Sequence, residues 1–115
     1  MTFTKKGVVI DIGSGSDYDK TSAYTPCVIY RGGLYRCYYT GNNGTNQRVM
    51  LAVSPDGFTW TKKGVVIDIG TDPDYDHHHA YTPSVIYRDG LYRCYYGGYD
   101  GTTYRILLAV SPDGF

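Results

Sequence analysis

Short apolar runs alternate with turn sequences along the whole chain, and this pattern predicts β-strands. The apolar runs are rich in Tyr, Val, Ile and Leu, and Tyr, Val and Ile in particular favour strands. Gly-Gly, Asn-Gly and Pro-Asp-Gly sequences separate the runs, and such sequences are typical of turns between antiparallel strands. We therefore predict a meander of four strands: inner (24–30), second (34–40), third (48–54) and outer (58–67, with 2–10 as its counterpart).

The pattern occurs twice. Residues 2–58 align with residues 59–115 without a gap, and 41 of the 57 aligned positions are identical. A repeat of this length is typical of arrays in which each unit buries its faces against neighbouring units. The predicted fold class is all-β: a β-propeller built from two four-stranded antiparallel blades per chain, which form a single two-blade fragment over residues 1–115.

The predicted strands are apolar on both faces. If the Gly-Gly pair at residues 32–33 is a two-residue turn, Cys27 faces Tyr38 and Val28 faces Cys37. Alternate side chains of a strand point to opposite faces, so Cys27 and Cys37 lie on opposite faces and cannot form a disulfide. A sheet that is apolar on both faces must be covered twice, which the radial packing of propeller blades achieves.

Arginine interrupts the apolar pattern in the middle of the second strand of each repeat. A partly buried guanidinium needs a partner, because an unpaired buried charge is costly. We expect the aspartates of the repeated loops to supply it, namely Asp19 or Asp11 for Arg36 and Asp76 or Asp68 for Arg93.

The ends of the chain indicate assembly. The sequence opens with an outer strand at residues 2–10 and stops at Phe115, before the outer strand of the second repeat. Propellers need about four or more blades to close a ring. We therefore expect a homo-oligomer closed by strand exchange, in which residues 2–10 of one copy pair with residues 105–111 of a neighbour.

The number of blades in the ring follows from the number of chains. Two blades per chain give four, six or eight blades for a dimer, trimer or tetramer. We prefer the trimer, and the alternative is a pentamer in which five chains share two five-bladed rings. Whether the repeat arose naturally or by engineering stays open.

Composition excludes several classes of partner. Eleven Lys and Arg balance eleven acidic residues, all of them Asp, so the chain is formally neutral. A neutral chain gives no electrostatic reason to expect nucleic acid or a membrane surface as a partner.

The N-terminal MTFTKKG lacks a signal-peptide core, so a cytoplasmic or recombinant protein is expected. The three cysteines, Cys27, Cys37 and Cys94, have no metal-site spacing and are interpreted as small strand residues.

Two segments carry a resemblance to a known family. LAVSPDGFTW at residues 51–60 and TPSVIYRDGLY at residues 82–92 resemble the blade repeats of the glycosidase-type five-bladed β-propellers. That group includes arabinanases, invertases, levansucrases and mannoside phosphorylases. The resemblance covers both repeats, and it implies a propeller fold with two Asp and one Glu at an axial pocket.

The catalytic acids that the resemblance implies are missing. The inner-strand position before proline, where catalytic blades carry Asp, holds Thr25 and Thr82, and the chain contains no Glu. Glycosyl transfer needs one carboxyl group as acid and a second carboxylate on the other face of the sugar. We therefore expect no catalytic residues, no enzyme activity and no cofactor.

Differences between the repeats gather at one end of the predicted blades. The repeats differ at 16 positions, and 11 of these lie in loops 11–23 and 40–47 and their counterparts. Two explanations account equally well for this clustering of differences: a binding face on a constant frame, or loops whose sequences vary without constraint. The candidate ligand-binding residues there are Asp17, Tyr18, Asp19, Asp74, Tyr75, Asp76, His77, His79, Tyr99, Asp100 and Tyr104.

Tyrosines on this face can stack on sugar rings, and aspartates can accept hydrogen bonds from sugar hydroxyls. In the alternative interpretation the repeated Tyr18 and Tyr75 only pack against the frame. The run from His77 to His79 has no acid at metal-motif spacing and is interpreted as a solvated loop, so no metal site is assigned.

Three functions compete. The preferred one is a structural module that self-assembles into a closed propeller without activity of its own. The alternative is a carbohydrate-binding module that uses the loop-rich face, with glycans as partners. A glycosidase-like enzyme is disfavoured by the absence of Glu.

Overall fold

The computed structural model describes residues 2–115; Met1, the first residue of the expected fragment, lies outside them. The prediction of an all-β fold is confirmed, and no helix that could cross a membrane is present among these residues. The chain forms seven strands: β1 (Ser22–Arg31), β2 (Leu34–Asn42), β3 (Gln47–Ser54), β4 (Thr61–Ile67), β5 (His79–Arg88), β6 (Leu91–Tyr99) and β7 (Tyr104–Ser111).

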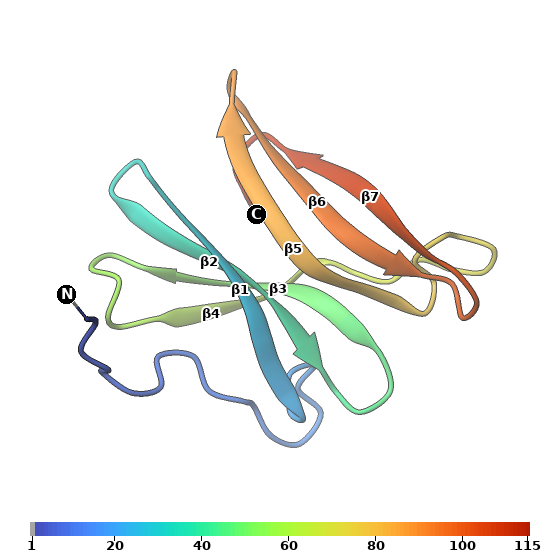
Figure 1. Ribbon diagram of the computed structural model, residues 1–115, viewed down its shortest axis with the longest axis horizontal. Coiled ribbons are helices and arrows are strands. Elements are labelled where there is room, and N and C mark those ends of the chain that lie inside the picture. Colours follow the sequence, from blue (N-terminus) through green and yellow to red (C-terminus); the bar gives the residue numbers. More distant parts are fainter. Residues whose placement is uncertain (1) are drawn as a thin grey trace.

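Strands β1 to β4 form an antiparallel meander, which we call the first meander (Figure 1). Between β1 and β2, Cys27 lies opposite Tyr38 and Val28 lies opposite Cys37, as predicted. A two-residue turn at Gly32 and Gly33 fixes this register. Both residues have positive φ angles, 61° and 78°, which glycine adopts readily.

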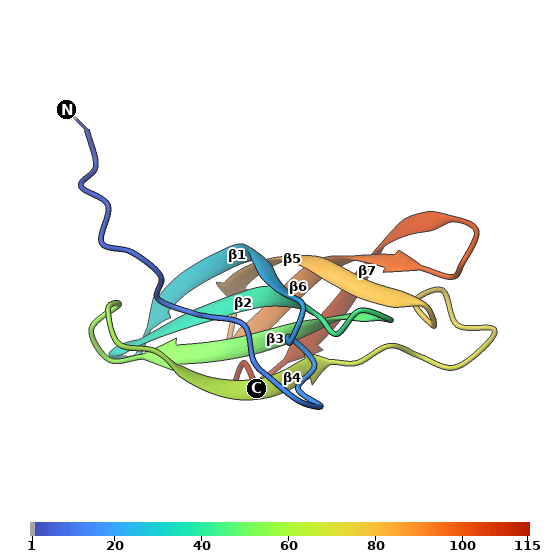
Figure 2. The same ribbon diagram turned by 90° about the horizontal axis from the view of Figure 1, so that it is seen from below.

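Strands β5 to β7 form the second meander, and its register repeats that of the first. Ser84 lies opposite Tyr95 and Val85 opposite Cys94, the counterparts of the pairs in the first meander. A single parallel bridge between Gln47 of β3 and His79 of β5 joins the two meanders into one seven-stranded sheet. Strand β5 also packs against β1, β2 and β3, so that the second meander lies beside the first (Figures 1 and 2).

The main hydrophobic core lies between the two meanders. It buries apolar residues from one face of each meander: Tyr38, Val49, Leu51 and Val53 from the first and Ala80, Val85, Tyr92, Cys94 and Tyr96 from the second. Cys27 packs at the edge of this core, whereas Cys37 belongs to a smaller cluster on the other face of the first meander. The prediction that these two cysteines lie on opposite faces is therefore confirmed.

The prediction of a strand at residues 2–10 is wrong for the single chain, since these residues form no strand. A strand requires a ladder with a neighbour, and β3, which pairs with the counterpart segment β4, already has β2 on its other edge. Residues 2–9 are exposed, and only Ile10 of this segment packs against the cluster of Cys37, Tyr39, Met50 and Ala52. In Figure 1 this segment lies at the lower left of the molecule and β7 at the upper right.

The prediction that loop aspartates pair with the mid-strand arginines Arg36 and Arg93 is wrong. Arg36 Nη1 donates a hydrogen bond to the carbonyl of Arg31 at 3.0 Å, and Arg93 Nη1 donates to the carbonyl of Arg88 at 2.8 Å. Both arginines lie near the hairpin turn at one end of their strand, whereas the aspartate loops lie at the other end, so the charges do not meet.

Candidate functional site

The variable loops gather at one end of the meanders, as predicted. The amide of Thr21 donates to the carbonyl of Asn42 at 2.9 Å, and the amide of His78 donates to the carbonyl of Tyr99 at 2.9 Å. These bonds fasten the loop before β1 to the end of β2, and the loop before β5 to the end of β6. Each of these loops is therefore tied to the sheet by a backbone hydrogen bond.

Asp19 is buried at this end, with only 1% of its surface exposed. Its carboxylate accepts hydrogen bonds from the hydroxyl of Tyr39 at 3.0 Å and from Nζ of Lys62 at 2.8 Å. Burial first, and then the Asp19 carboxylate, raise the pKa of Tyr39. A Cβ at Gly41 would clash with Sδ of Met50 and lie 3.0 Å from the Cβ of Asp19, so glycine leaves room for both side chains.

Asp76, the counterpart of Asp19, is also buried, with 8% exposed. Its carboxylate accepts a hydrogen bond from the hydroxyl of Tyr96 at 2.8 Å. Burial and then this carboxylate raise the pKa of Tyr96. Among residues 2–115 no Lys, Arg or His forms an ion pair with Asp76, in contrast to Asp19.

The other candidate aspartates close their own loops. The carboxylates of Asp17 and Asp74 accept backbone hydrogen bonds from Ser14 at 3.0 Å and Thr71 at 3.1 Å. Asp100 accepts two backbone N–H bonds, from Thr103 first and then Thr102, which lower its pKa. Carboxylates used in this way stabilise turns.

Three of the predicted aromatic and histidine residues come together on β5 to β7. Tyr104 stacks on Tyr99 with 4.3 Å between ring centroids, and Tyr99 stacks on His79 at 5.6 Å. Tyr104 is 67% exposed. Beside it lies a pocket of about 280 Å³ that Tyr81 and Arg105 also line. Among the described residues, these candidates form a continuous aromatic surface that suits a ring-shaped ligand.

The remaining candidates have structural roles. Arg48 lies over the ring of Tyr18 at 4.3 Å and Arg105 over that of Tyr75 at 4.6 Å, which favours the interpretation that these tyrosines pack against the frame. Nδ1 of His77 lies 2.8 Å from the carbonyl of Asp74. No group of three or more potential metal ligands occurs in the described part of the chain.

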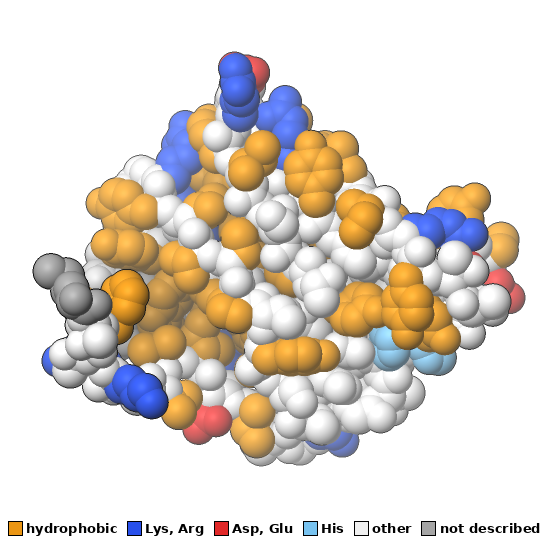
Figure 3. Space-filling view, viewed as in Figure 1, with side chains coloured by type: hydrophobic (Ala, Val, Ile, Leu, Met, Phe, Trp, Pro, Cys, Tyr) orange, Lys and Arg blue, Asp and Glu red, His pale blue; other side chains and the backbone are white. Residues whose placement is uncertain are grey.

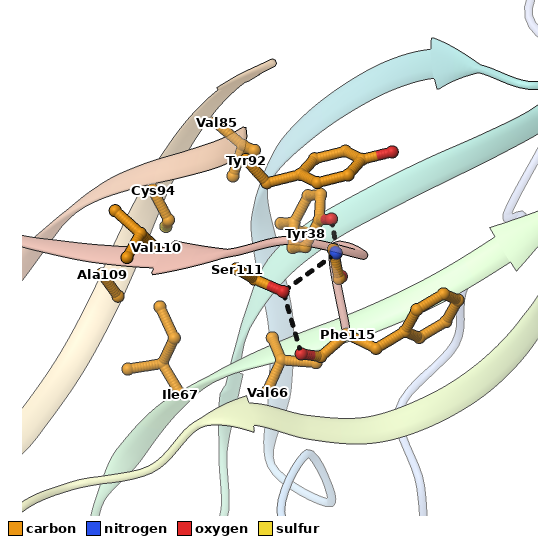
Figure 4. Close-up of a pocket in the computed structure, with 11 residues that line it drawn as sticks. Tyr38, Val66, Ile67, Val85, Tyr92, Cys94, Ala109, Val110, Ser111 and Phe115 are labelled. Atoms are coloured by element: carbon orange, nitrogen blue, oxygen red, sulfur yellow. Dashed lines mark hydrogen bonds between the residues drawn. The ribbon is translucent and has the colours of Figure 1, made fainter. Parts of the chain in front are cut away.

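Sequence reasoning missed the pocket between the meanders. It has a volume of about 80 Å³ and lies between β4 and the β6–β7 pair (Figure 4). The hydroxyl of Tyr38 donates to the carbonyl of Gly114 at 2.8 Å, and Oγ of Ser111 accepts from the amide of Gly114 at 3.0 Å at its edge. The lining is mostly apolar, so this pocket belongs to the packing of the meanders.

A larger hollow lies on the other face of the first meander. It measures about 340 Å³, and its lining is almost entirely apolar: Val8, Val9, Ile10, Ala23, Tyr24, Pro26, Val28, Cys37, Tyr39 and Trp60. Hydrophobic side chains gather beside the N-terminal segment in the space-filling view (Figure 3). None of the three pockets described is lined by an acidic residue.

A protein-family model matches nearly the whole chain. A family model described as "Glycosyl hydrolases family 32 N-terminal domain" matches residues 1–114. An uncharacterized protein of Mycobacterium tuberculosis (strain CDC 1551 / Oshkosh) is 35% identical over 103 residues, which cover 84% of this chain and 33% of that protein. The chain thus spans about a third of the length of the curated relatives that it matches.

Solved structures share the fold. Zg3597, a family 117 glycoside hydrolase from the marine bacterium Zobellia galactanivorans, superposes with a TM-score of 0.76 at 22% identity, over 94% of this chain and 41% of that chain. The Bacillus subtilis arabinanase Arb43A superposes with a TM-score of 0.60 at 23% identity, over 80% of this chain and 35% of that chain. At these identities the likeness establishes the fold alone.

Proposed function

The chain belongs to the family of the glycosyl hydrolases family 32 N-terminal domain, and from this premise we propose that it is a two-blade, self-assembling propeller module. Each meander is one blade, and copies of the chain join head to tail into a closed ring. The module has no catalytic activity of its own. The resemblance to glycosidase-type propeller blades is confirmed by the family match and the structural neighbours.

The observation that carries this proposal is the contrast between repeat counterparts. Leu51 is fully buried in the core between the meanders, whereas its counterpart Leu108 is 53% exposed on the outer face of β7. Val53 and Val110 differ in the same way, with 8% and 56% exposed. The outer face of the second meander therefore presents side chains that, in the first meander, are buried against a neighbouring blade.

The surface complementary to this face is present on the same chain. In the core, the first meander packs against the face of the second meander that carries Val85 and Cys94. The counterparts of these two residues, Val28 and Cys37, line the apolar hollow of the first meander. A second copy can thus dock its hollow face on the outer face of β5–β7 and reproduce an interface that the fold already contains. Such head-to-tail contacts close into rings when the rotation permits.

The proposed lack of activity rests on the absence of Glu and of acidic residues lining the three pockets described. Thr25 and Thr82 occupy the positions before proline, the chain has no Glu, and the buried Asp19 and Asp76 belong to separate meanders. Because no acidic residue lines these pockets, they offer no candidates for the acid and base roles of glycoside hydrolysis. Turnover of an aryl glycoside by the purified chain would contradict this part of the proposal.

A carbohydrate-binding role is the second candidate, and the stacked row of Tyr104, Tyr99 and His79 favours it. Aromatic faces on a rigid strand frame suit sugar rings. Calorimetric titration or a glycan array tests it, with Tyr104→Ala as the variant that should lose binding and Tyr18→Ala as the control.

Native mass spectrometry tests the assembly. We expect multiples of the 12.8 kDa chain, with a trimer preferred and a pentamer as the alternative. Leu108→Asp should dissociate the ring, because it places a charge in the proposed interface at a position exposed in the single chain. Thr102→Asp, on an exposed turn, is the matched control and should leave the ring intact. A stable monomer at micromolar concentration would contradict the proposal.

A further inference from the structure

Lys62 completes a buried site in the first meander. It lies on β4, opposite Ala52 of β3, and its Nζ reaches the Asp19 carboxylate at 2.8 Å while the hydroxyl of Tyr39 binds the same oxygen. The amide of Gly13 holds the loop by donating to the carbonyl of Asp19 at 3.3 Å. The site therefore consists of a buried carboxylate, a buried hydroxyl and one cation.

The second meander reproduces every part of this site except the cation. Asp76 accepts a hydrogen bond from Tyr96 at 2.8 Å, and the amide of Gly70 donates to the carbonyl of Asp76 at 3.3 Å. Ala109 of β7 is the counterpart of Ala52, but no strand pairs with β7 on its outer edge within residues 2–115. The cation is missing because the strand that would carry it is not beside β7.

We infer that Lys5 of a neighbouring copy supplies the missing cation and forms an ion pair with Asp76. Lys5 is the repeat counterpart of Lys62 and is exposed in the single chain. This inference rests on the proposed assembly and names the contact that sets the register between copies. Shifting the β3–β4 register by one repeat places Lys5 opposite Ala109 and Ile10 opposite Ile106 of the next chain.

The physical chemistry favours this residue over the lysine next to it. A buried carboxylate without a cation is costly, so a neighbouring chain that brings an ammonium group to Asp76 gains a contact that the single chain lacks. In the first meander Nζ of Lys62 reaches the Asp19 carboxylate, whereas the adjacent Lys63 forms no ion pair among the described residues. Lys5 is the counterpart of Lys62 and Lys6 that of Lys63, so Lys5 is the lysine expected to reach Asp76. The ion pair also disfavours a slip by one residue, which would exchange the two lysines.

A double-mutant cycle tests the pair. Lys5→Gln and Asp76→Asn should each weaken ring assembly by roughly tenfold or more, and the double variant should be no weaker than either alone. Lys6→Gln is the matched control and should assemble like the unmodified chain. Circular dichroism of each variant verifies that the meanders still fold, and additive losses in the double variant would overturn the pairing.

Zero-length carbodiimide cross-linking supplies a second measurement. The reagent joins a lysine amine and a carboxylate in contact into an amide with loss of water. In mixed ¹⁴N and ¹⁵N protein, we expect an amide between Lys5 and Asp76 of different chains. The link between Lys62 and Asp19 within one chain serves as the positive control.

The outcomes separate the two proposals. A ring with the Lys62–Asp19 link but neither the Lys5–Asp76 link nor coupling in the cycle overturns this inference and leaves the assembly standing. A chain that stays monomeric overturns the assembly and the inference with it. A ring that shows both the interchain link and the coupling supports both.

Discussion

The hydroxyl of Tyr38 in β2 donates a hydrogen bond at 2.8 Å to the carbonyl of Gly114, which belongs to the turn after β7. The bond joins residues 76 positions apart and ties the end of the second meander to the face of the first. Burial is the main cause of the raised pKa of Tyr38, so its hydroxyl is a neutral donor throughout the ordinary pH range.

Tyr38→Phe should destabilise the chain by about 1–2 kcal/mol, because it leaves the buried carbonyl of Gly114 without a donor. Urea denaturation followed by tryptophan fluorescence measures the change. Tyr30→Phe is the control: its side chain is exposed, and the loss there should be within about 0.5 kcal/mol. Equal stability of Tyr38→Phe and the unmodified chain would contradict the importance of this bond.

Gly13→Ala should destabilise the first loop by about 1–3 kcal/mol. A Cβ at this position would lie 2.7 Å from the Cβ of Asp17 and 2.6 Å from Oδ1 of Asp19, so the loop must move and loosen the ion pair with Lys62. The urea midpoint measures the loss. Ser16→Ala, an exposed change in the same loop, should leave the midpoint unchanged.

The strand pairing could be predicted from the sequence because it depends on local rules. Two-residue turns fix the register of adjacent strands, and the period of two then assigns each side chain to a face. Cys27, Cys37 and Tyr38 accordingly lie where the pattern places them. The two-residue rule applies again in the second meander, where Val85 lies opposite Cys94.

Contacts between distant segments could not be predicted in the same way. The ion pair of Lys62 with Asp19 joins residues 43 positions apart, and neither hairpin register specifies it. The charge of Arg36 predicts a loop aspartate as its partner. Arg36 lies near the hairpin turn, however, and its guanidinium binds the carbonyl of Arg31 instead. The segment 2–10 has the sequence of a strand, but a strand also requires a partner edge.

The thiols provide a test of the predicted faces. Cys37 and Cys94 are buried, and burial raises the pKa of each thiol to about 11. At pH 8 a thiol reagent should therefore label at most one cysteine of the native chain, the half-buried Cys27, and all three after unfolding. Cys27→Ser, which copies Ser84 of the second repeat, should show no native labelling. Rapid labelling of two or more native thiols would contradict the packing of both faces.

His79 makes the link between the meanders sensitive to pH. Its Nδ1 accepts a hydrogen bond from the amide of Gln47 at 3.1 Å, beside the parallel bridge of β3 and β5. Burial, and then the neighbouring His78, lower the pKa of His79 below its ordinary value of about 6.5. Protonation on Nδ1 removes the acceptor, so the folded state binds this proton less well than the unfolded chain does.

The stability of the chain should therefore fall as the pH decreases from 7 to 5, because the unfolded chain gains the proton first. The aspartates that close the turns do not contribute in this range. Backbone N–H bonds lower the pKa values of Asp56 and Asp113 below the ordinary value of 3.8. These carboxylates therefore stabilise the folded chain fully well above pH 3.8, and this contribution is lost only at lower pH. Thermal melts at pH 7, 6 and 5 measure the slope, and His79→Asn, whose amide oxygen accepts without titrating, should flatten it. His77→Asn should keep the slope, and an unchanged slope in His79→Asn would assign the pH dependence to another group.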